Sequence, residues 1–402
     1  MKLGIVSCYF INNYGSILQA YALQEYFKTK GIECDTISVE GLKSYLAAKK
    51  RQYYFHNIHN VGLIFSKLPM INLKLLQKLN YKNLGHKYSE RVRKFDDFRK
   101  NFNLSNESAS SLRQLSDLSV IYDMVMVGSD QLWRPDNIFP EYYTLNWVPD
   151  NIPKVSYATS FGVAQLDRCY KSKARFFLNR LSAISVRESS GCDLVKELTG
   201  KIPYIVCDPV FLLTKNQWTM LSDTSCCPSQ KYIFTYFLGE GRECRKFVKQ
   251  LSAVTGLPVL GVVHNDSYIA SDEHMDYPIA SCSPNEFLGL ISNAEYICTD
   301  SFHATAFSTI FNKNFFVFNR FKSQKHGTNS RIKSFLQMIG LENRLINNPV
   351  KVHGIIPNDI EYETVNDKIL SFINKSYDFI EKEILQGVSC NVQEKDFASQ
   401  LD

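Results

Sequence analysis

The sequence predicts an α/β protein made of two doubly wound, Rossmann-like domains that face a cleft. At 402 residues the chain is longer than one hydrophobic core usually supports, which favours two domains. Short apolar runs alternate with segments of helical periodicity from the first residues onwards, as is typical of parallel sheets with helices on both faces. This alternation occurs in two series, so two sheets are expected.

The first series lies in residues 1–210, which we predict as the N-terminal domain. It opens with LGIVSCYF, a helix whose apolar residues recur from Ile17 to Phe27, and CDTISV, an order typical of a right-handed βαβ unit. Residues 43–115 lack strand alternation, so we predict a basic helical insertion there. The later strand-like runs are VIYDMVMVG, VSYATSFG, AISVRE and YIVCDPV.

The second series lies in residues 211–362, which we predict as the C-terminal domain. Its strands are KYIFTYFLG, LPVLGVV, EYICTD and FFVFNRF, with a helix expected from about Phe302. Residues 363–402 form an amphipathic stretch followed by a polar tail. We therefore expect a closing helix that packs back across both domains.

The charge of the chain is concentrated in one segment. The net charge is +6, but residues 43–100 contain 14 Lys and Arg against Glu90, Asp96 and Asp97. A solvated helical face and contact with an anionic membrane surface both fit this composition. Nucleic-acid binding is not expected, because no recognition motif accompanies the basic residues.

Several classes of protein are excluded by the motifs that the sequence lacks. No secretion signal precedes the first strand, and the apolar runs are far shorter than the ~20 residues that cross a bilayer, so a cytoplasmic protein is expected. The 11 cysteines show neither CxxC nor zinc-type spacing, which indicates reduced thiols. GEGREC lacks the third glycine of a dinucleotide motif, and HExxH, GxSxG and Walker A patterns are absent. We expect no metal and no cofactor.

Polar residues cluster in the loops that follow predicted strands, where open parallel sheets bind ligands. In the first loop, Gly15 permits close backbone approach at a helix N-terminus, which suits an anion or the hydroxyls of a sugar. A capping turn with a structural glycine is the alternative. The candidate residues of this loop are Asn12, Asn13, Tyr14 and Gly15.

The second loop follows the apolar run MVMV. A carboxylate, an amide and an indole close together are typical of carbohydrate sites, which use hydrogen bonds and a flat stacking surface. For the aspartate, a helix cap is the alternative. The candidates are Ser129, Asp130, Gln131 and Trp133.

Two further loops contain Arg187 and His303. Arg187 ends a predicted buried strand, where its charge requires either a bound carboxylate or phosphate or a neighbouring acid such as Glu188. His303 follows Asp300 and Ser301 at the start of a predicted helix, where it can donate a proton beside backbone N–H groups. A structural histidine is the alternative.

Five motifs, taken in order, resemble the polysaccharide pyruvyl transferase family: NYGSILQAYALQ, VGSDQLW, SVRE, CDPVFLL and DSFHATAFSTIFNK. The resemblance covers nearly the whole chain and implies a GT-B-like fold with the acceptor on the N-terminal domain and the donor on the C-terminal domain. It implies that phosphoenolpyruvate is a co-substrate whose pyruvate becomes a ketal on two hydroxyls of a sugar. The product would belong to exopolysaccharide or capsular polysaccharide biosynthesis.

The same resemblance assigns roles to Arg187 and His303, and the mechanism it implies also needs a base. It implies that Arg187 and His303 hold phosphoenolpyruvate, and His303 would then protonate the enolpyruvyl methylene. Asp130 or Asp208 would act as the base toward the acceptor hydroxyl. Arg187 and other cations would neutralise the carboxylate and phosphate, so the reaction would need no metal.

The chain departs from the family pattern at Ser301, which stands where an arginine is expected. Cations gather after the last predicted strand, and one of them is expected to supply the missing charge. A solvated basic loop would have the same composition. These cations are Arg320, Lys322 and Arg331.

The resemblance also bears on partners and alternatives. Acceptor sugars in this family are often linked to a lipid diphosphate carrier, and the basic insertion would then contact the inner face of the cytoplasmic membrane. A GT-B glycosyltransferase using a nucleotide sugar would share the fold, although no base-reading pocket is evident. A non-catalytic glycan-binding relative would suit the loss of the arginine.

Overall fold

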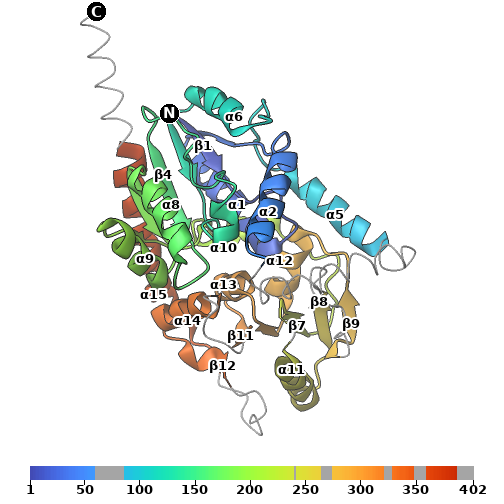
Figure 1. The fold of residues 1–402 in the computed structure, drawn as a ribbon. Helices are drawn as coiled ribbons and strands as arrows, with labels where there is room; N and C mark the ends of the chain where they lie inside the picture. Colours follow the sequence, from blue (N-terminus) through green and yellow to red (C-terminus); the bar gives the residue numbers. More distant parts are fainter. Residues whose placement is uncertain (59–85, 240, 264–273, 321–327, 348–358, 387–402) are drawn as a thin grey trace, which may run out of the picture.

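The computed structural model describes residues 1–58, 86–239, 241–263, 274–320, 328–347 and 359–386 (Figure 1). Two parallel sheets of six strands each, covered by helices, form two α/β units. The predicted fold class of two doubly wound, GT-B-like domains is confirmed. The first sheet ends at Ile205 and the second begins at Ile233, on either side of residue 210.

The first sheet has the strand order β2-β1-β3-β4-β5-β6. The strands β3, β4 and β5 are buried along their whole length, and apart from Lys154, which donates to the Pro149 and Ile152 carbonyls, and Tyr157 their residues are apolar or small. The order reverses between β1 and β3, so the loops after these two strands flank the crevice where such sheets bind ligands. The strands are β1 (Lys2–Val6), β2 (Glu33–Thr36), β3 (Met124–Val127), β4 (Lys154–Thr159), β5 (Ala183–Val186) and β6 (Tyr204–Ile205).

The second sheet has the order β12-β11-β10-β7-β8-β9, which reverses between β7 and β10. The strands are β7 (Ile233–Tyr236), β8 (Val259–Val262), β9 (Tyr277–Ile279), β10 (Tyr296–Thr299), β11 (Asn314–Phe318) and β12 (Leu345–Ile346). The sequence did not predict β9 and β12. Both are edge strands of two or three partly exposed residues, too short to show strand alternation.

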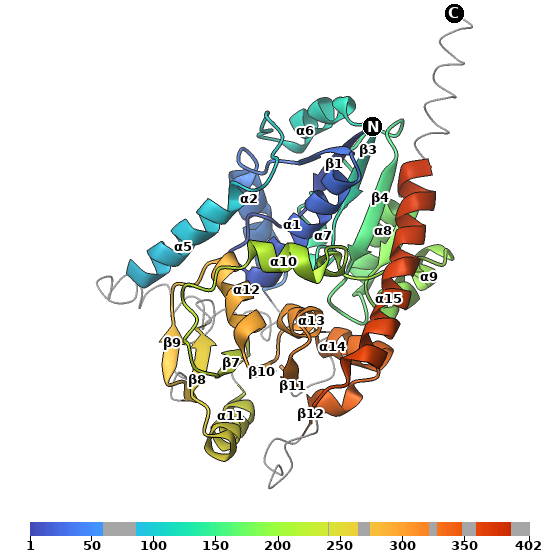
Figure 2. The same ribbon diagram turned by 180° about the vertical axis from the view of Figure 1, so that it is seen from behind.

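Helices cover both sheets (Figures 1 and 2). In the first unit they are α1 (Tyr14–Thr29), α6 (Leu112–Leu118), α7 (Pro135–Ile138), α8 (Arg168–Asn179) and α9 (Ser189–Thr199). In the second unit they are α10 (Lys215–Leu221), α11 (Arg242–Thr255), α12 (Pro284–Asn293), α13 (Phe302–Ile310) and α14 (Thr328–Ile339). None of the described helices combines the length and apolarity that a membrane span requires.

Helix α1 lies at the junction of the two units. Asn13 caps it, because the Asn13 side chain accepts a hydrogen bond from the Ser16 backbone N–H at 3.1 Å. The fully buried Tyr14 stacks on Phe287 of α12 with ring centroids 4.3 Å apart, and its hydroxyl donates to the Cys282 carbonyl at 2.8 Å. The N-terminus of α1 is therefore packed directly against the second unit.

The basic insertion forms helices α2 (Lys43–His56) and α5 (His86–Arg99), and residues 59–85 lie outside the described part of the chain. Helix α5 reaches the second unit with two of its cations. Arg91 donates to the Val263 carbonyl at 2.8 Å, and Lys94 pairs with Glu286 at 2.7 Å. Two of the positive charges of the insertion therefore form contacts within the protein, and these contacts link the two units.

Replacing Arg91 by Ala should destabilise the protein by about 1.5–3 kcal/mol, because the guanidinium is buried, hydrogen-bonded and 4.9 Å from the Tyr14 ring centre. Urea unfolding measures this loss. The matched control is Arg93→Ala on the same helix, whose side chain is 69% exposed and whose loss should change stability by no more than about 0.5 kcal/mol. Equal effects of the two substitutions would contradict the bridging role of α5.

The closing helix α15 (Tyr362–Phe379) continues into a π-helical segment, Ile380–Gln386, and runs beside both units (Figure 2). At its start, the Tyr362 hydroxyl donates to the Lys313 carbonyl in the second unit at 2.5 Å. Near its end, the Ser376 hydroxyl accepts from the Cys207 backbone N–H in the first unit at 2.8 Å. The predicted polar tail after Gln386 lies outside the described residues.

Candidate active site

Asp130 connects the loops that follow β1 and β3, the two strands between which the order of the first sheet reverses. It follows β3, and its carboxylate accepts from the Ser16 hydroxyl of α1 at 2.6 Å and from its neighbour's backbone, Gln131 N–H, at 2.8 Å. Burial opposes ionisation of Asp130, but the charges of His303 and Arg187 outweigh it and lower its pKa. An ionised carboxylate therefore stands at the N-terminus of α1.

Arg187 follows β5 and is enclosed by three carboxylates. Its Nη1 atom donates to Asp208 Oδ2, while Nη2 lies 3.8 Å from Asp130 Oδ1 and Nε lies 3.9 Å from Glu188 Oε2. Burial lowers the pKa of Arg187, but the three acids raise it further than burial lowers it. Its Nε and Nη2 atoms have no hydrogen-bond partner among the described residues, so both N–H groups can bind an added anion.

Asp208 is the centre of the cluster. Its Oδ1 atom accepts from the Val210 N–H at 3.2 Å in the turn after β6, and its Oδ2 atom accepts from Arg187 and from the Ser129 hydroxyl at 3.3 Å. Burial disfavours the charged form, yet the charges of His303 and Arg187 lower the pKa of Asp208 well below its usual range. Asp208 thus holds cations in place.

His303 reaches this cluster from the other unit. It lies in the first turn of α13, is 7% exposed, and places Nε2 3.4 Å from Asp208 Oδ2. Its Nδ1 atom lies against Gly15 so closely that a Cβ on that glycine would come within 2.0 Å of it. Only a glycine leaves room for the ring here. An imidazole and a guanidinium from opposite units therefore meet on one carboxylate.

Asp300 joins the loops that follow β7 and β10, the two strands between which the order of the second sheet reverses. Its carboxylate accepts from the backbone N–H groups of Leu238 and Gly239 at 2.7 and 2.8 Å. Arg320 donates to the Asp300 carbonyl at 3.1 Å. Ser301 is the N-cap of α13, since its hydroxyl accepts from the Ala304 N–H at 3.4 Å. The Asp300 carboxylate and the Ser301 hydroxyl therefore stabilise the loop that precedes His303.

Two predicted site residues are buried away from any ligand. Trp133 is fully buried, packs on Phe161 and Phe177, and donates its indole N–H to the Tyr143 carbonyl at 3.3 Å. The prediction of an indole stacking surface is therefore wrong, because this loop turns back into the core. Tyr14 likewise packs between the two units, as described above, and offers no face to a substrate.

The remaining predicted residues have local partners or lie outside the described region. Asn12 accepts from Arg99 of α5, and Gln131 accepts from Arg134 at 3.5 Å. Arg331 is buried at the start of α14. Lys322 lies outside the described residues.

Sequence reasoning missed two residues of the cluster. The Ser16 hydroxyl donates a hydrogen bond to Asp130. In the sequence, only the position of Ser16 in the first turn of the predicted helix could have suggested this role. Glu188 was named merely as a neutralising neighbour for Arg187, but it is 4% exposed and accepts from the Ser160 hydroxyl at 2.6 Å. Its Oε2 atom has no hydrogen-bond partner among the described residues.

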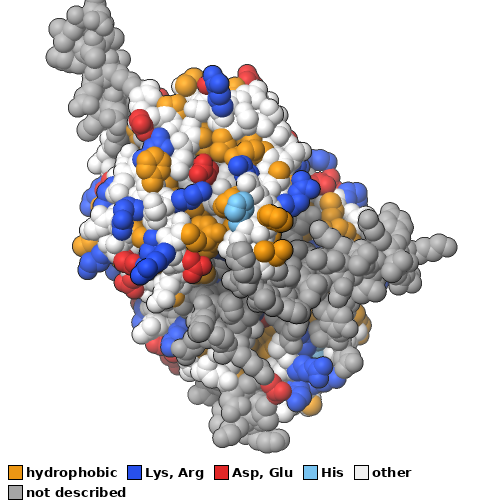
Figure 3. Space-filling model, viewed as in Figure 1, with side chains coloured by type: hydrophobic (Ala, Val, Ile, Leu, Met, Phe, Trp, Pro, Cys, Tyr) orange, Lys and Arg blue, Asp and Glu red, His pale blue; other side chains and the backbone are white. Residues whose placement is uncertain are grey.

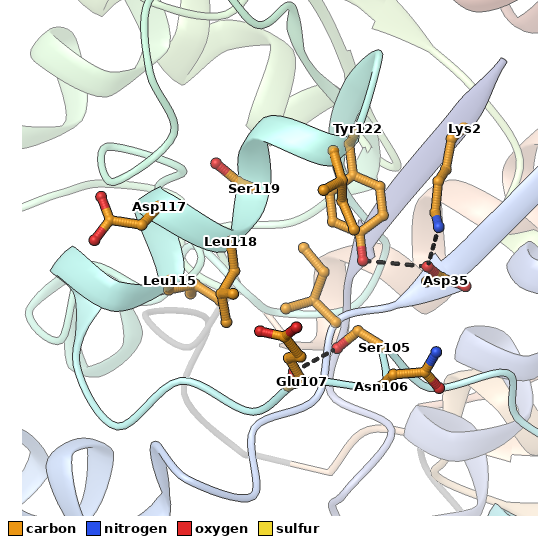
Figure 4. A pocket seen from close by; sticks show the side chains of 12 residues that line it. Lys2, Asp35, Ser105, Asn106, Glu107, Leu115, Asp117, Leu118, Ser119 and Tyr122 are labelled. Atoms are coloured by element: carbon orange, nitrogen blue, oxygen red, sulfur yellow. Dashed lines mark hydrogen bonds and ion pairs between the residues drawn. The ribbon is translucent and has the colours of Figure 1, made fainter.

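A separate cavity of about 220 Å³ lies at the opposite edge of the first sheet (Figure 4). Lys2, at the amino end of β1, and Tyr122 both contact Asp35 there, at 3.5 and 3.3 Å. Lys2 and Tyr122 thus share Asp35 as their partner, and none of the residues Asp130, Arg187, Asp208 and His303 lines the cavity. In the described part of the chain, no group of three or more His, Cys, Asp and Glu is placed to hold a metal ion.

Comparison with solved structures finds distant likenesses. UDP-N-acetylglucosamine 2-epimerase from Rickettsia bellii is 11% identical, with 96% of this chain and 98% of that chain covered and a TM-score of 0.43. A glycosyltransferase from Streptomyces nogalater is 11% identical, with 94% of each chain covered and a TM-score of 0.43. The ADP-heptose heptosyltransferase II of E. coli is 10% identical, with 92% and 99% covered and a TM-score of 0.38. Likenesses this distant carry nothing about the reaction.

Comparison at the level of sequence identifies the family. No curated protein matches the chain. The family model described as polysaccharide pyruvyl transferase matches residues 13–322, which is most of the chain. The matched region includes Asp130, Arg187, Asp208 and His303, the four side chains at the centre of the cluster. The chain therefore belongs to the polysaccharide pyruvyl transferase family.

Proposed function

We propose that this protein transfers pyruvate from phosphoenolpyruvate to two hydroxyls of a sugar in a precursor of a cell-surface polysaccharide, forming a pyruvate ketal. Membership of the family supports a transferase. The observation that supports this donor is the meeting of Arg187 and His303 on Asp208 from opposite units. A small phosphorylated enol acid requires a cation that binds its anionic groups and an acid that protonates it. A guanidinium and an imidazole can fill these two roles.

In this proposal His303 donates a proton to the methylene carbon of the enolpyruvyl group, which becomes a methyl group. The adjacent carbon gains oxocarbenium character, and a sugar hydroxyl forms a C–O bond to it while losing its proton to a base. The bond between this carbon and the phosphate oxygen then breaks, and phosphate leaves with the electron pair. The second hydroxyl forms the second C–O bond and closes the ketal ring, while its proton returns to the imidazole of His303. Arg187 neutralises negative charge on the donor throughout.

Asp130 is the better placed of the two candidate bases. The lowered pKa of Asp130 and of Asp208 makes each carboxylate a weaker base than a free one. The side chain of Asp130 is 17% exposed, whereas that of Asp208 is 0% exposed and held by Arg187 and Ser129. We therefore assign contact with the acceptor hydroxyl to Asp130 and positioning of Arg187 and His303 to Asp208.

We further propose a lipid-diphosphate-linked acceptor, which places the reaction at the inner, cytoplasmic face of the membrane. Figure 3 shows Lys and Arg side chains around apolar ones on the face that includes α2 and α8. Phe55 and Ile58, at the end of α2, are 74% and 54% exposed, and the cations Lys49 and Arg51 lie on the same helix. Exposed apolar groups among cations suit an anionic leaflet.

The direct test is mass spectrometry of lipid-linked sugars incubated with the purified protein and phosphoenolpyruvate. We expect product carrying the added pyruvyl mass, together with released phosphate. Calorimetry should show binding of phosphoenolpyruvate but not of a nucleotide sugar. Binding of the nucleotide sugar alone would favour a glycosyltransferase, and binding of glycan without turnover would favour a non-catalytic relative.

Replacing Gly15 by Ala should lower the rate of ketal formation by about 10²-fold, the scale of loss when a reacting group is misplaced by about 1 Å. The new Cβ would meet His303 Nδ1 at 2.0 Å, so the ring must move. Turnover assays by mass spectrometry measure the effect. The control is Gly241→Ala, where the nearest described atom is Cys244 Sγ at 3.4 Å. Unaltered turnover in Gly15→Ala would show that the position of the His303 ring is unimportant.

A further inference from the structure

Arg331 is a buried arginine whose role the packing of the fold does not explain. It lies in the first turn of α14 and is 7% exposed. Its Nε atom has no hydrogen-bond partner among the described residues. A buried N–H group that lacks a hydrogen-bond partner costs free energy, so this atom points to a ligand that supplies the missing contact.

Aromatic packing places Arg331 beside Arg187. Phe335 lies one helical turn after Arg331 on the same face of α14, and its ring centre is 5.7 Å from that of Phe302. The Phe302 ring in turn lies 4.7 Å from the guanidinium carbon of Arg187. Burial and the charge of Arg187 lower the pKa of Arg331 to about 9, so Arg331 is still a cation at neutral pH.

The two guanidiniums have different electrostatic surroundings. Arg187 is within ion-pairing distance of the three carboxylates described above. Two of the same acids, Glu188 and Asp130, and the cations Arg187 and Arg320 also act on Arg331, but its buried Nε has no hydrogen-bond partner among the described residues. A phosphate, which has up to two negative charges, is repelled by three carboxylates more strongly than a singly charged carboxylate is. Phosphate is therefore better accommodated at Arg331.

We propose that Arg331 binds the phosphate group of the donor, while Arg187 binds its carboxylate. The inference rests on the proposed function, because it divides the two anionic ends of phosphoenolpyruvate between two guanidiniums. Ser301 cannot supply the second cation, since a serine hydroxyl is neutral, and this one caps α13. The positive charge comes instead from the first turn of α14.

Arg331→Gln should weaken the binding of phosphoenolpyruvate and of inorganic phosphate by about 10- to 100-fold in isothermal titration calorimetry. Arg331→Lys should recover part of the affinity, because it restores the charge without the planar fork. Arg344→Gln removes another buried arginine of the second unit and should leave both affinities unchanged. Without ligand, Arg331→Gln should be about as stable to urea as the wild type, since the cost of burying the guanidinium with its unpaired Nε is removed together with its attraction to Glu188 and Asp130.

The outcomes separate this inference from the proposed function. If the wild type binds phosphoenolpyruvate and Arg331→Gln binds both ligands equally well, the assignment of Arg331 is wrong and the proposed function stands. Marked loss of stability in ligand-free Arg331→Gln would also overturn it, in favour of a structural role. If the wild type binds phosphate through Arg331 but not phosphoenolpyruvate, the proposed function fails and Arg331 remains a phosphate-binding residue.

Discussion

Replacing His303 by Ala should lower the rate of pyruvyl transfer by about 10²–10⁴-fold, the range that a positioned general acid contributes. His303 is the imidazole that meets Asp208 and Gly15 at the junction of the two units. The binding of phosphoenolpyruvate should change much less than turnover, because Arg187 remains in place. Single-turnover assays by mass spectrometry, together with calorimetric titration of the donor, separate the two effects.

The control for this substitution is His274→Ala. His274 is also buried in the second unit, but it lies beside Thr235 of β7, on a different part of the sheet. Its loss should leave turnover per folded molecule unchanged. Full turnover in His303→Ala, with a normal unfolding transition, would remove His303 from the mechanism.

Replacing Arg187 by Ala should destabilise the protein by about 3–5 kcal/mol and abolish donor binding. The side chains of Arg187 and Asp208 are 2% and 0% exposed, so removal of the guanidinium leaves a buried carboxylate without its closest cation. Urea unfolding measures the loss of stability, and calorimetry measures donor binding wherever the variant remains folded.

A double variant, Arg187→Met with Asp208→Leu, separates the structural role of this ion pair from its functional one. Replacing both partners by apolar groups should recover part of the stability, because Asp208 no longer remains as a buried carboxylate without its closest cation, although Asp130 and Glu188 still lose Arg187. Donor binding should stay lost. Recovery of donor binding in the double variant would contradict the role of Arg187 as an anion ligand.

Acidification tests the same ion pair without a change at Arg187. The pKa of Asp208 is lower in the folded protein than in the unfolded chain, where it is about 3.9. Its contribution to stability is therefore complete above that unfolded value and is lost as pH falls through the lower folded value. The stability difference between the wild type and Asp208→Asn should shrink below about pH 4. A difference that stays constant across that range would contradict the ionised state of Asp208.

The alternation of strands and helices, and the types of residue at the strand ends, could be predicted from the sequence alone. Apolar periodicity is a local property, so runs such as the one ending at Val127 or Val186 could be assigned without a structure. Because ligands of parallel sheets bind at the carboxyl ends of strands, Arg187 and His303 could be selected as candidates. The motif order was sufficient for the family, which the family model confirmed.

Only the tertiary structure decided which of these candidates meet and which are buried. Gly15 and His303 are 288 positions apart and lie on helices of different units, so their contact depends on how the two units pack. The neighbours of Trp133 in sequence do not show that its loop folds back against Phe161 and Phe177. Composition likewise did not show that Arg91 of the basic insertion points inward. The physical reason is that burial and long-range contacts arise from strand order and domain packing, which no short stretch of sequence specifies.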